Sequence, residues 1–480
     1  MSALGGVDYG IFNLIAGVIA MLAFLNTAMA TSTQRYLSFH QGRKDPDMLK
    51  KIFSNSVTLH LLIGLCIVIG LEIAGFFLFD GFLNIPSSRI GSARILYHFM
   101  IGSVFFSIIL VPFISSLNAN ENMLWIALVS IIEVLLKLLI AIFLLNLKGD
   151  KLLFYGLLTT LLSLLVLILH TSYCLKMYEE CTLNKFWITD KRLMKELTSF
   201  AGWNLFGSLC TLGRAEGFAI LFNLFFGTLI NAAFGIANQV AGQLSFFSVT
   251  MLQALNPQIM KSEGADDRNR MLRLSMIASK FSFFLLAILA IPIIFEMDYI
   301  LKFWLKNVPE FTVTFCRLLL IGTMVNQLTI GLQSALQATG KIKKYQITVG
   351  SLILFNLPLA YVLLKQGFPV YSTLISYIVI EFIACSLRVL FLKKIGGLSI
   401  KEYLSRVIFR EIMPVLCSIT VCFFVMNNFD MNYRFLFTIF FSSVVFMFSI
   451  YFVGLCKDEK DLIKIIFFNL IKKIKPQEKF

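Results

Sequence analysis

The sequence predicts an all-α polytopic membrane protein with about thirteen transmembrane helices. Hydrophobic residues make up 58% of the 480 residues, and the mean hydropathy is +0.83. Only 14% of the residues are charged, whereas soluble domains carry roughly 25%. Apolar runs of about 20 residues recur along the chain, and each is long enough to cross roughly 30 Å of hydrocarbon.

Length and flanking charge place the spans along the chain. We expect them at residues 9–31, 54–79, 95–116, 123–145, 152–174, 200–226, 232–255, 274–295, 313–336, 345–364, 371–392, 407–426 and 435–456. The span at 407–426 contains Arg410 and Glu411, which we expect to extend out of the apolar region.

Charge in the connecting loops predicts the orientation of the chain. Alternate connections are basic, with roughly 29 Lys and Arg on one set against about 8 on the other, so the basic set is expected to be cytoplasmic. The amino terminus is then expected to be extracytoplasmic and the carboxyl terminus cytoplasmic. The basic tail at 457–480 is expected to lie along the inner membrane surface. The net charge of +15 is accounted for by loops facing anionic lipid and not by nucleic acid.

The sequence lacks the motifs of several enzyme classes. It has no G-x-x-x-x-G-K-[ST] loop for ATP, and its four His residues are scattered without metal-ligand spacing. The predicted loops are too short to form a catalytic domain. We therefore expect no enzyme activity and no cofactor, and any function resides in the membrane helices.

Two short repeats relate the halves of the chain. "YGIFN" at residues 9–13 is repeated as "FGIAN" at 234–238, and "SSLNA" at 115–119 is repeated as "SALQA" at 334–338. Both pairs are separated by about 220 residues and six spans, which predicts two parallel half-transporters with substrate bound between them. The sixth span then opens the second half and has no counterpart in the first, so the first half is expected to lack its first helix.

Charged residues inside predicted spans are the main functional signal, because they normally face a cavity or a partner. Arg214 lies in mid-span, and Glu216, two positions on, points to another face and cannot neutralise it within the helix. Arg214 either binds substrate or forms an interhelical ion pair. Lys137 lies one turn from Glu133, the spacing of a helical ion pair, and Lys280 either lines the cavity or extends to the interface.

Acidic and amide side chains complete the predicted site. Buried carboxylates can exchange protons or pair with neighbours, and the candidates for ion coupling are Glu72, Glu133, Glu216 and Glu381. Amides hydrogen-bond sugar hydroxyls or hold helices together. The amides predicted to bind substrate are Asn204, Asn223, Gln239 and Asn326. Arginine, lysine and amides together suit a ligand with a phosphate head and a sugar body.

Two long segments carry a family resemblance. The segments "LGGVDYGIFNLIAGVIAMLAFLNTAMATSTQRYLSF" and "NAAFGIANQVAGQLSFFSVTMLQALNPQIMKS", with "SALQATGKIKKYQ", resemble the Wzx-like polysaccharide flippases of the MOP exporter superfamily. The likeness covers essentially the whole chain. It implies a MATE-like bundle of two lobes in a V shape, followed by two extra helices, in a family that normally has fourteen spans. For this chain it implies an amino-terminal lobe at 1–180 without its first helix, a carboxyl-terminal lobe at 181–396 and extra helices at 397–456.

The resemblance also implies a function. Wzx-like flippases move undecaprenyl-diphosphate-linked oligosaccharide to the periplasmic leaflet by alternating access for surface polysaccharide synthesis, with an H⁺ or Na⁺ gradient as the expected driving force. A cationic central cavity is typical of them, with Arg214 on the first helix of the second lobe and Lys137 and Lys280 matched by span. A polysaccharide polymerase and glycosyltransferases are the expected protein partners. A MATE-like multidrug or cation extruder and a peptidoglycan-precursor flippase remain the alternatives.

Overall fold

All regular elements that the structure describes are helices. The structure is a computed structural model, and it describes residues 4–20, 23–82, 85–182, 190–429 and 433–461. Most of the predicted basic tail, including Lys464 and Lys472, lies outside these residues. The chain forms two compact units. Unit 1 is Met1–Leu209 with Met260–Asp267 and Ile342–Ile347, and unit 2 is Cys210–Ile259, Arg268–Lys341 and Thr348–Phe480.

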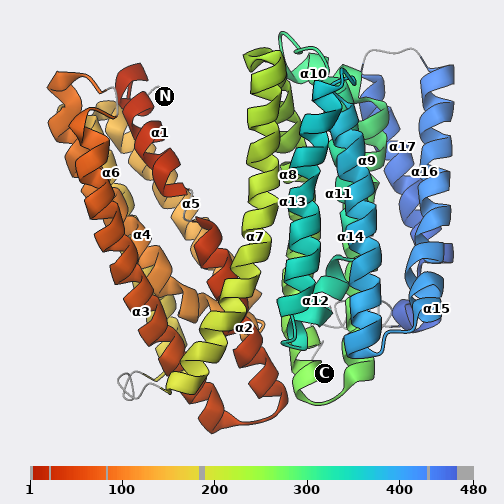
Figure 1. Cartoon of the computed structure of the whole chain (residues 1–480), viewed down its shortest axis with the longest axis horizontal. Helices are drawn as coiled ribbons and strands as arrows, with labels where there is room; N and C mark the ends of the chain where they lie inside the picture. The colour runs from red at the N-terminus through yellow and green to blue at the C-terminus, as the bar shows by residue number, and fades with distance from the viewer. Residues whose placement is uncertain (1–3, 21–22, 83–84, 183–189, 430–432, 462–480) are drawn as a thin grey trace, which may run out of the picture. The chain divides into compact units, whose positions relative to one another are not determined.

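Unit 1 contains the first six α-helices and the beginning of the seventh (Figure 1). In this unit α4 packs along α2, α3 and α6. Polar residues at the helix starts cap free backbone N–H groups, as when Asp45 accepts from Met48 N and Asn122 from Trp125 N. The helices are α1 (Gly6–Ala20), α2 (Ala23–Gly42), α3 (Pro46–Phe77), α4 (Ile90–Ala119), α5 (Met123–Asn146) and α6 (Lys151–Met177), with short turns η1 (Leu78–Phe82) and η2 (Ser87–Arg89).

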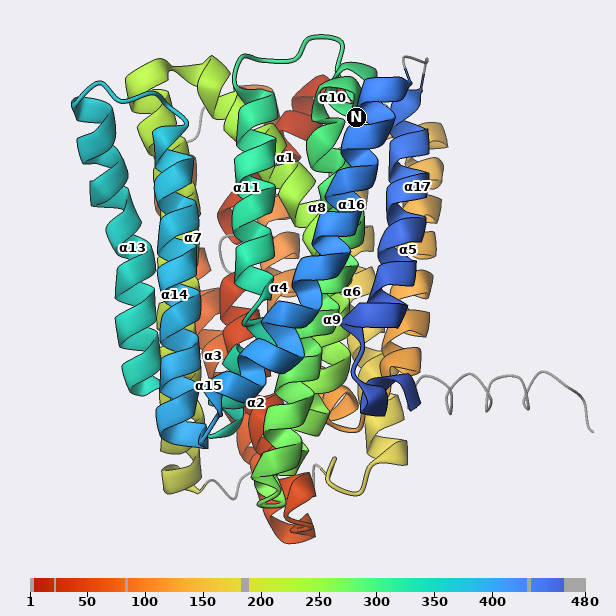
Figure 2. The same cartoon turned by 90° about the vertical axis from the view of Figure 1, so that its right-hand side faces the viewer.

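Unit 2 is built around α9 and α11, which pack on α12, α14, α16 and α17 (Figure 2). Both α7 and α8 are long and continue from one unit into the other. The helices are α7 (Lys191–Phe226), α8 (Thr228–Gly264), α9 (Arg268–Phe295), α10 (Met297–Trp304), α11 (Thr312–Gln327), α12 (Ile330–Ala338), α13 (Lys343–Lys365), α14 (Ser372–Gly396), α15 (Ile400–Tyr403), α16 (Phe409–Asn428) and α17 (Arg434–Ser449), with π-helical turns η3 (Leu404–Ile408) and η4 (Ile450–Gly454).

The predicted membrane character is confirmed. In the described parts of the chain, ten helices are long and apolar enough to cross a membrane, or up to eleven if α11 and α12, bent by 42°, form one span. The helix α8 is not among them although it has 37 residues. Its Asn and Gln side chains lower its mean hydropathy, so α8 is less apolar than a helix that is surrounded by lipid.

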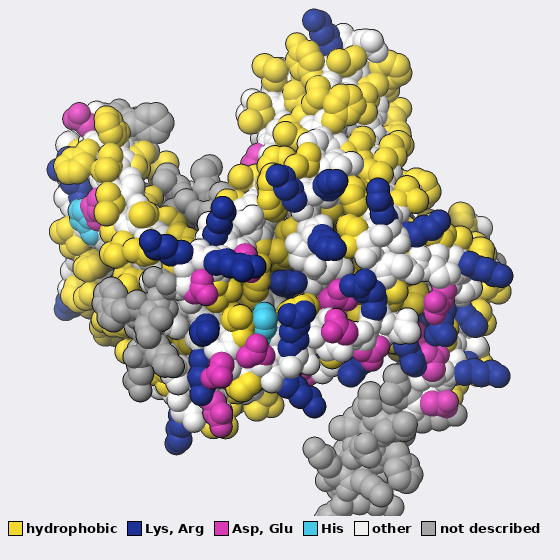
Figure 3. Space-filling view, turned by 60° about the horizontal axis from the view of Figure 1, so that its bottom comes forward, with side chains coloured by type: hydrophobic (Ala, Val, Ile, Leu, Met, Phe, Trp, Pro, Cys, Tyr) yellow, Lys and Arg dark blue, Asp and Glu magenta, His cyan; other side chains and the backbone are white. Residues whose placement is uncertain are grey.

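Basic side chains gather at one end of the helices. Figure 3 looks onto this end and shows Lys and Arg in dark blue among Asp and Glu. The connection between α2 and α3, one of the predicted cytoplasmic loops, lies at this end (Figure 1). The assignment of this end to the cytoplasm remains a prediction.

The helix α16 corrects one expectation. Arg410 reaches the carbonyl oxygen of Val453, with an Nη1–O distance of 2.7 Å. Glu411 does not extend out of the helix bundle of unit 2, because only 3% of it is exposed. The sequence does not reveal this, since the burial of Glu411 depends on the helices packed against α16.

Close packing between α9 and α12 depends on Gly331. A Cβ atom at this position would collide with the backbone oxygen of Ser275 and would lie 2.7 Å from the backbone nitrogen of Ser279. We predict that Gly331→Ala lowers the free energy of unfolding by about 1–3 kcal/mol, because overpacking forces rigid backbone apart. Thermal unfolding of the detergent-solubilised protein, followed by size-exclusion chromatography, measures this. Gly202→Ala in α7 is the matched control, since no atom lies within 4 Å of its Cβ position. Equal melting temperatures for the two variants would contradict the prediction.

Candidate functional site

Arg214 lies on the buried face of α7. Phe218 and Phe222 follow it at four-residue intervals and are part of the apolar core of unit 2. The guanidinium carbon of Arg214 lies 4.6 Å from the ring centroid of Tyr377. Its Nη2 donates a hydrogen bond of 2.7 Å to Oε1 of Glu381.

Glu381 on α14 joins three helices of unit 2. Its Oε1 accepts from Arg214 on α7, and its Oε2 accepts from Nδ2 of Asn326 on α11 at 2.8 Å. The side chains of Arg214 and Glu381 are only 8% and 2% exposed. The cluster is therefore a buried, charge-balanced connection between α7, α11 and α14.

This geometry bears on the two alternatives for Arg214. The sequence separates Arg214 and Glu381 by 167 residues and shows no link between them. Of the two alternatives for Arg214, the structure has the interhelical ion pair. Glu216 is exposed and does not pair with Arg214 among the described residues, as expected from its spacing of two residues from Arg214. The Nη1 atom of Arg214 is buried and has no hydrogen-bond partner among the described residues.

The two other predicted cations are also paired. Lys137 on α5 donates to Oε1 of Glu133 at 2.6 Å, which confirms the helical ion pair, and its side chain is 57% exposed. Lys280 on α9 is 1% exposed and lies 2.5 Å from Oε2 of Glu459, which corrects the expectation that it faces a cavity or extends to the interface. Its Nζ also donates to the backbone oxygen of Gly454 at 3.2 Å.

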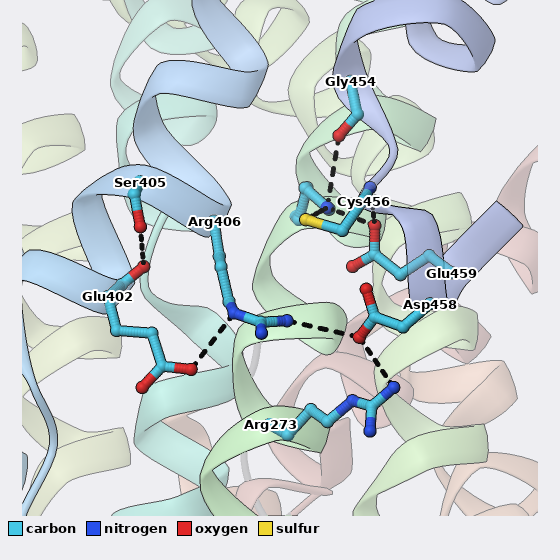
Figure 4. A network of polar contacts seen from close by, with 9 residues as sticks. Arg273, Glu402, Ser405, Arg406, Gly454, Cys456, Asp458 and Glu459 are labelled. Atoms are coloured by element: carbon cyan, nitrogen blue, oxygen red, sulfur yellow. Dashed lines mark hydrogen bonds and ion pairs between the residues drawn. The ribbon is translucent and has the colours of Figure 1, made fainter.

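The segment after η4 is held by further ion pairs, which Figure 4 shows in detail. The carboxylate of Asp458 accepts from Arg273 at 2.6 Å and from Arg406 at 3.2 Å. Arg406 also pairs with Glu402 at 3.1 Å. Together with Lys280 and Glu459, these residues fix residues 454–459 against α9 and η3.

The remaining predicted residues lie in different surroundings. Asn204 is buried and accepts from Nε2 of Gln346 at 3.1 Å, so it does not line an open face. Glu72 pairs with Nδ1 of His98 at 3.0 Å. Asn223 and Gln239 are exposed. Within unit 2, Arg214, Glu381 and Asn326 form one cluster, and Glu216 and Asn223 line a separate cavity. The structure does not test the roles of the predicted residues.

One polar face of unit 2 is not used for internal packing. Glu216, Asn223 and Asn231 line a cavity of about 330 Å³ beside α7 and α8. Farther along α8, exposed amides continue on the side opposite its buried Ala233, Ala237 and Ala241. We call the half-buried Asn231 and the exposed Asn238, Gln239 and Gln243 the α8 amide face. Asn238, Gln239 and Gln243 follow Asn231 by seven, eight and twelve residues, a spacing that places all four on one side of a helix. Asn231 could have been predicted from this spacing in the sequence.

The same pattern occurs in unit 1. Gly10, Asn13 and Gly17 of α1 match Gly235, Asn238 and Gly242 of α8 in type and spacing, and all six are exposed. No atom lies within 4 Å of the Cβ positions of these four glycines. The short repeat found in the sequence thus corresponds to an open helix face in each unit.

No metal site is evident in the part of the chain that the structure describes. It contains no group of three or more His, Cys, Asp or Glu side chains placed to hold a metal ion. The polar interactions described above are hydrogen bonds of amide groups and ion pairs.

Comparison with known structures identifies the fold. A MATE mutant matches with a TM-score of 0.71 and 15% identity, covering 82% of this chain and 90% of that one. An outward-facing MATE family transporter of the MOP superfamily matches at 0.70 and 15% identity, covering 82% and 89%. A MOP superfamily transporter from Pyrococcus furiosus Vc1 matches at 0.70 and 15% identity, covering 84% and 90%. No protein-family model and no curated protein matches the sequence. The chain has the fold of MATE transporters, which confirms the predicted fold class.

The Arg214–Glu381 pair generates a stability prediction. Arg214→Gln leaves the Glu381 charge buried without its cation, and we expect it to lower the free energy of unfolding by about 3–5 kcal/mol. The double variant Arg214→Met, Glu381→Leu removes both charges and is expected to recover most of this loss. Thermal unfolding in detergent measures both variants. A single variant as stable as the native protein would show that the pair does not hold the helices together.

Asp458 generates a pH prediction. Burial alone would raise its pKa, but Arg273 and Arg406 hold the pKa of this carboxyl below its usual 3.8. The stabilisation is therefore complete above pH 3.8 and is lost as the pH falls through the lower pKa of the folded state. The protection of residues 450–461 from hydrogen exchange, measured relative to the intrinsic exchange rate at each pH, should fall in that acidic range. In Asp458→Asn the exchange should already be fast at neutral pH, and exchange in this variant that matched the native protein at neutral pH would contradict the assignment.

Proposed function

We propose that this protein is a membrane transporter that translocates a lipid-linked oligosaccharide by alternating access. The observation that carries the proposal is the α8 amide face, an exposed polar surface on a helix of a membrane protein. Amide groups exposed to hydrocarbon would lose their hydrogen bonds with water at a cost of several kcal/mol. Such a face is therefore expected to border water and a polar solute.

The chemistry of this face favours a sugar. Each amide offers both donors and an acceptor, which match the hydroxyl groups of a glycan without requiring a fixed charge. A lipid-linked glycan needs such a path only for its polar head, since its polyprenyl tail remains in lipid. Three cations expected to line a cavity, Arg214, Lys137 and Lys280, each pair with a carboxylate, so they offer less charge to an anionic ligand.

The fold and the family resemblance support the rest of the proposal. The similar structures are described as MATE and MOP superfamily transporters. On this basis we propose an H⁺ or Na⁺ gradient as the energy source and the bacterial inner membrane as the location. The diphosphate-linked substrate, the partnership with a polymerase and glycosyltransferases, and a role in surface polysaccharide synthesis rest on the resemblance to Wzx-like flippases.

A second candidate is extrusion of cations, as in MATE transporters. It is favoured by Glu216, whose exposed carboxylate lies with Asn223 and Asn231 in the 330 Å³ cavity. A carboxylate at this position attracts a cation and repels a diphosphate.

Transport by the reconstituted protein tests both candidates. We predict that proteoliposomes translocate undecaprenyl-diphosphate-linked oligosaccharide, and that the double variant Asn238→Leu, Gln239→Leu slows translocation at least roughly tenfold, since it removes two amide contacts. Thr420→Val is the matched control, because this exposed hydroxyl bonds only to the backbone of its own helix at Leu416 in the structure.

The outcomes separate the candidates. Efflux of a cationic dye that is abolished by Glu216→Gln, without glycolipid translocation, would support the cation extruder. Preference for a peptidoglycan lipid precursor over other lipid-linked glycans would support a peptidoglycan-precursor flippase. Native translocation rates in the double variant would contradict the role of the α8 amide face.

A further inference from the structure

An apolar cavity of about 520 Å³ lies in unit 2 between α9, α11 and α16. These three helices lie close together in Figure 2. Phe283 and Ile291 line the cavity from α9, Met324 from α11, and Val415 from α16. Every other lining side chain is also apolar except Glu411. The volume falls in the range of small-molecule sites in proteins, about 300–1,000 Å³.

The carboxylate of Glu411 accepts no hydrogen bond from any residue that the structure describes. Glu411 is 3% exposed, and neither Oε1 nor Oε2 has a hydrogen-bond partner among the described residues. Other buried carboxylates of unit 2 are satisfied: Glu381 pairs with Arg214, and Glu296 accepts from Arg434 and Thr438. A buried carboxylate without a partner is costly, so its presence calls for a ligand or another compensating group.

The nearest candidate for a protein partner is already engaged. Lys280 of α9 interacts electrostatically with Glu411, but its ammonium group donates to Glu459 and to the backbone oxygen of Gly454. No hydrogen bond in the described structure fixes the carboxylate. Glu411 is one of the side chains that line the cavity, so its carboxyl group is available to a ligand there.

The position of Glu411 on α16 places it among apolar residues that line the same cavity. Ile408, Glu411 and Val415 are spaced by three and four residues, so they lie on one side of the helical segment, and all three line the cavity. Ile412 and Leu416, at the edge of the same cavity, are 44% and 52% exposed. A ligand entering past these two residues would meet an apolar wall with one acidic group.

From this geometry we propose that the cavity binds an amphiphilic amine, with the ammonium group on Glu411 and the apolar body against the phenylalanine, isoleucine and methionine side chains. An ammonium group supplies both the charge and the hydrogen-bond donors that the carboxylate lacks. A lipid acyl chain would fill the apolar volume and would leave the carboxylate unpaired. The proposal concerns a different site from the α8 amide face and does not depend on the proposed transport function.

Binding of a charge series to the full-length protein in nanodiscs tests this proposal. Decylammonium, decanol and decanoate have the same chain and differ in the head group. We expect saturable binding of decylammonium by equilibrium dialysis at one site per chain, with an increase in melting temperature. The variant Glu411→Gln should bind decylammonium at least tenfold more weakly and should bind decanol as the native protein does.

Two further variants complete the test. Glu402→Gln removes an exposed carboxylate that pairs with Arg406, and it should bind decylammonium as tightly as the native protein. Val415→Phe fills the cavity and should weaken the binding of both decylammonium and decanol. Glu411→Gln keeps the shape of the side chain and removes an unpaired charge, so it should fold at least as stably as the native protein.

Three results would overturn the proposal. The first is an absence of saturable decylammonium binding. The second is equal decylammonium affinity in the native protein and Glu411→Gln, which would indicate a lipid-chain site. The third is tighter binding of decanoate than of decylammonium, which would assign the cavity to an anion.

Discussion

The structure depends on the requirement that a charge inside a membrane helix bundle be paired. Unit 2 meets this requirement three times with contacts between distant segments. Arg214 pairs with Glu381 across α7 and α14, Lys280 pairs with Glu459 beyond η4, and Arg434 pairs with Glu296 at the start of α17. Each pair also fixes the position of one helix against another, because breaking it would leave a charge in a medium of low dielectric constant.

Two sets of polar groups in unit 2 are not used in these ion pairs, and they are the ones that indicate ligand binding. Along α8, amides are exposed on one side, while alanines on the opposite side pack into the core of unit 2. In α16, one carboxylate is buried at an apolar cavity without a hydrogen bond in the described structure. Neither feature stabilises the fold by itself, so we interpret both as places where a ligand binds. The first suits a sugar, and the second suits an amine.

The charges that first suggested an anionic substrate have a different explanation. A mid-span arginine is as compatible with an interhelical ion pair as with a ligand, and the sequence alone cannot separate these cases. The structure assigns Arg214 and Lys280 to buried pairs and Lys137 to a pair on an exposed helix face. Neutral hydrogen-bonding groups, and not these cations, are therefore the better candidates for contacts with a substrate.

Features that depend on neighbours along one helix could be predicted from the sequence. Apolar runs predicted the helical membrane fold, and a spacing of four residues predicted the Glu133–Lys137 pair. The short repeat predicted two related halves, but the open faces that it forms on α1 and α8 are seen only in the structure. The structure also shows that Arg214 contacts Glu381, 167 residues away, and that Lys280 contacts Glu459, 179 residues away. Helix periodicity encodes contacts within one turn or two, whereas pairing between helices depends on how their side chains pack, which no local pattern records.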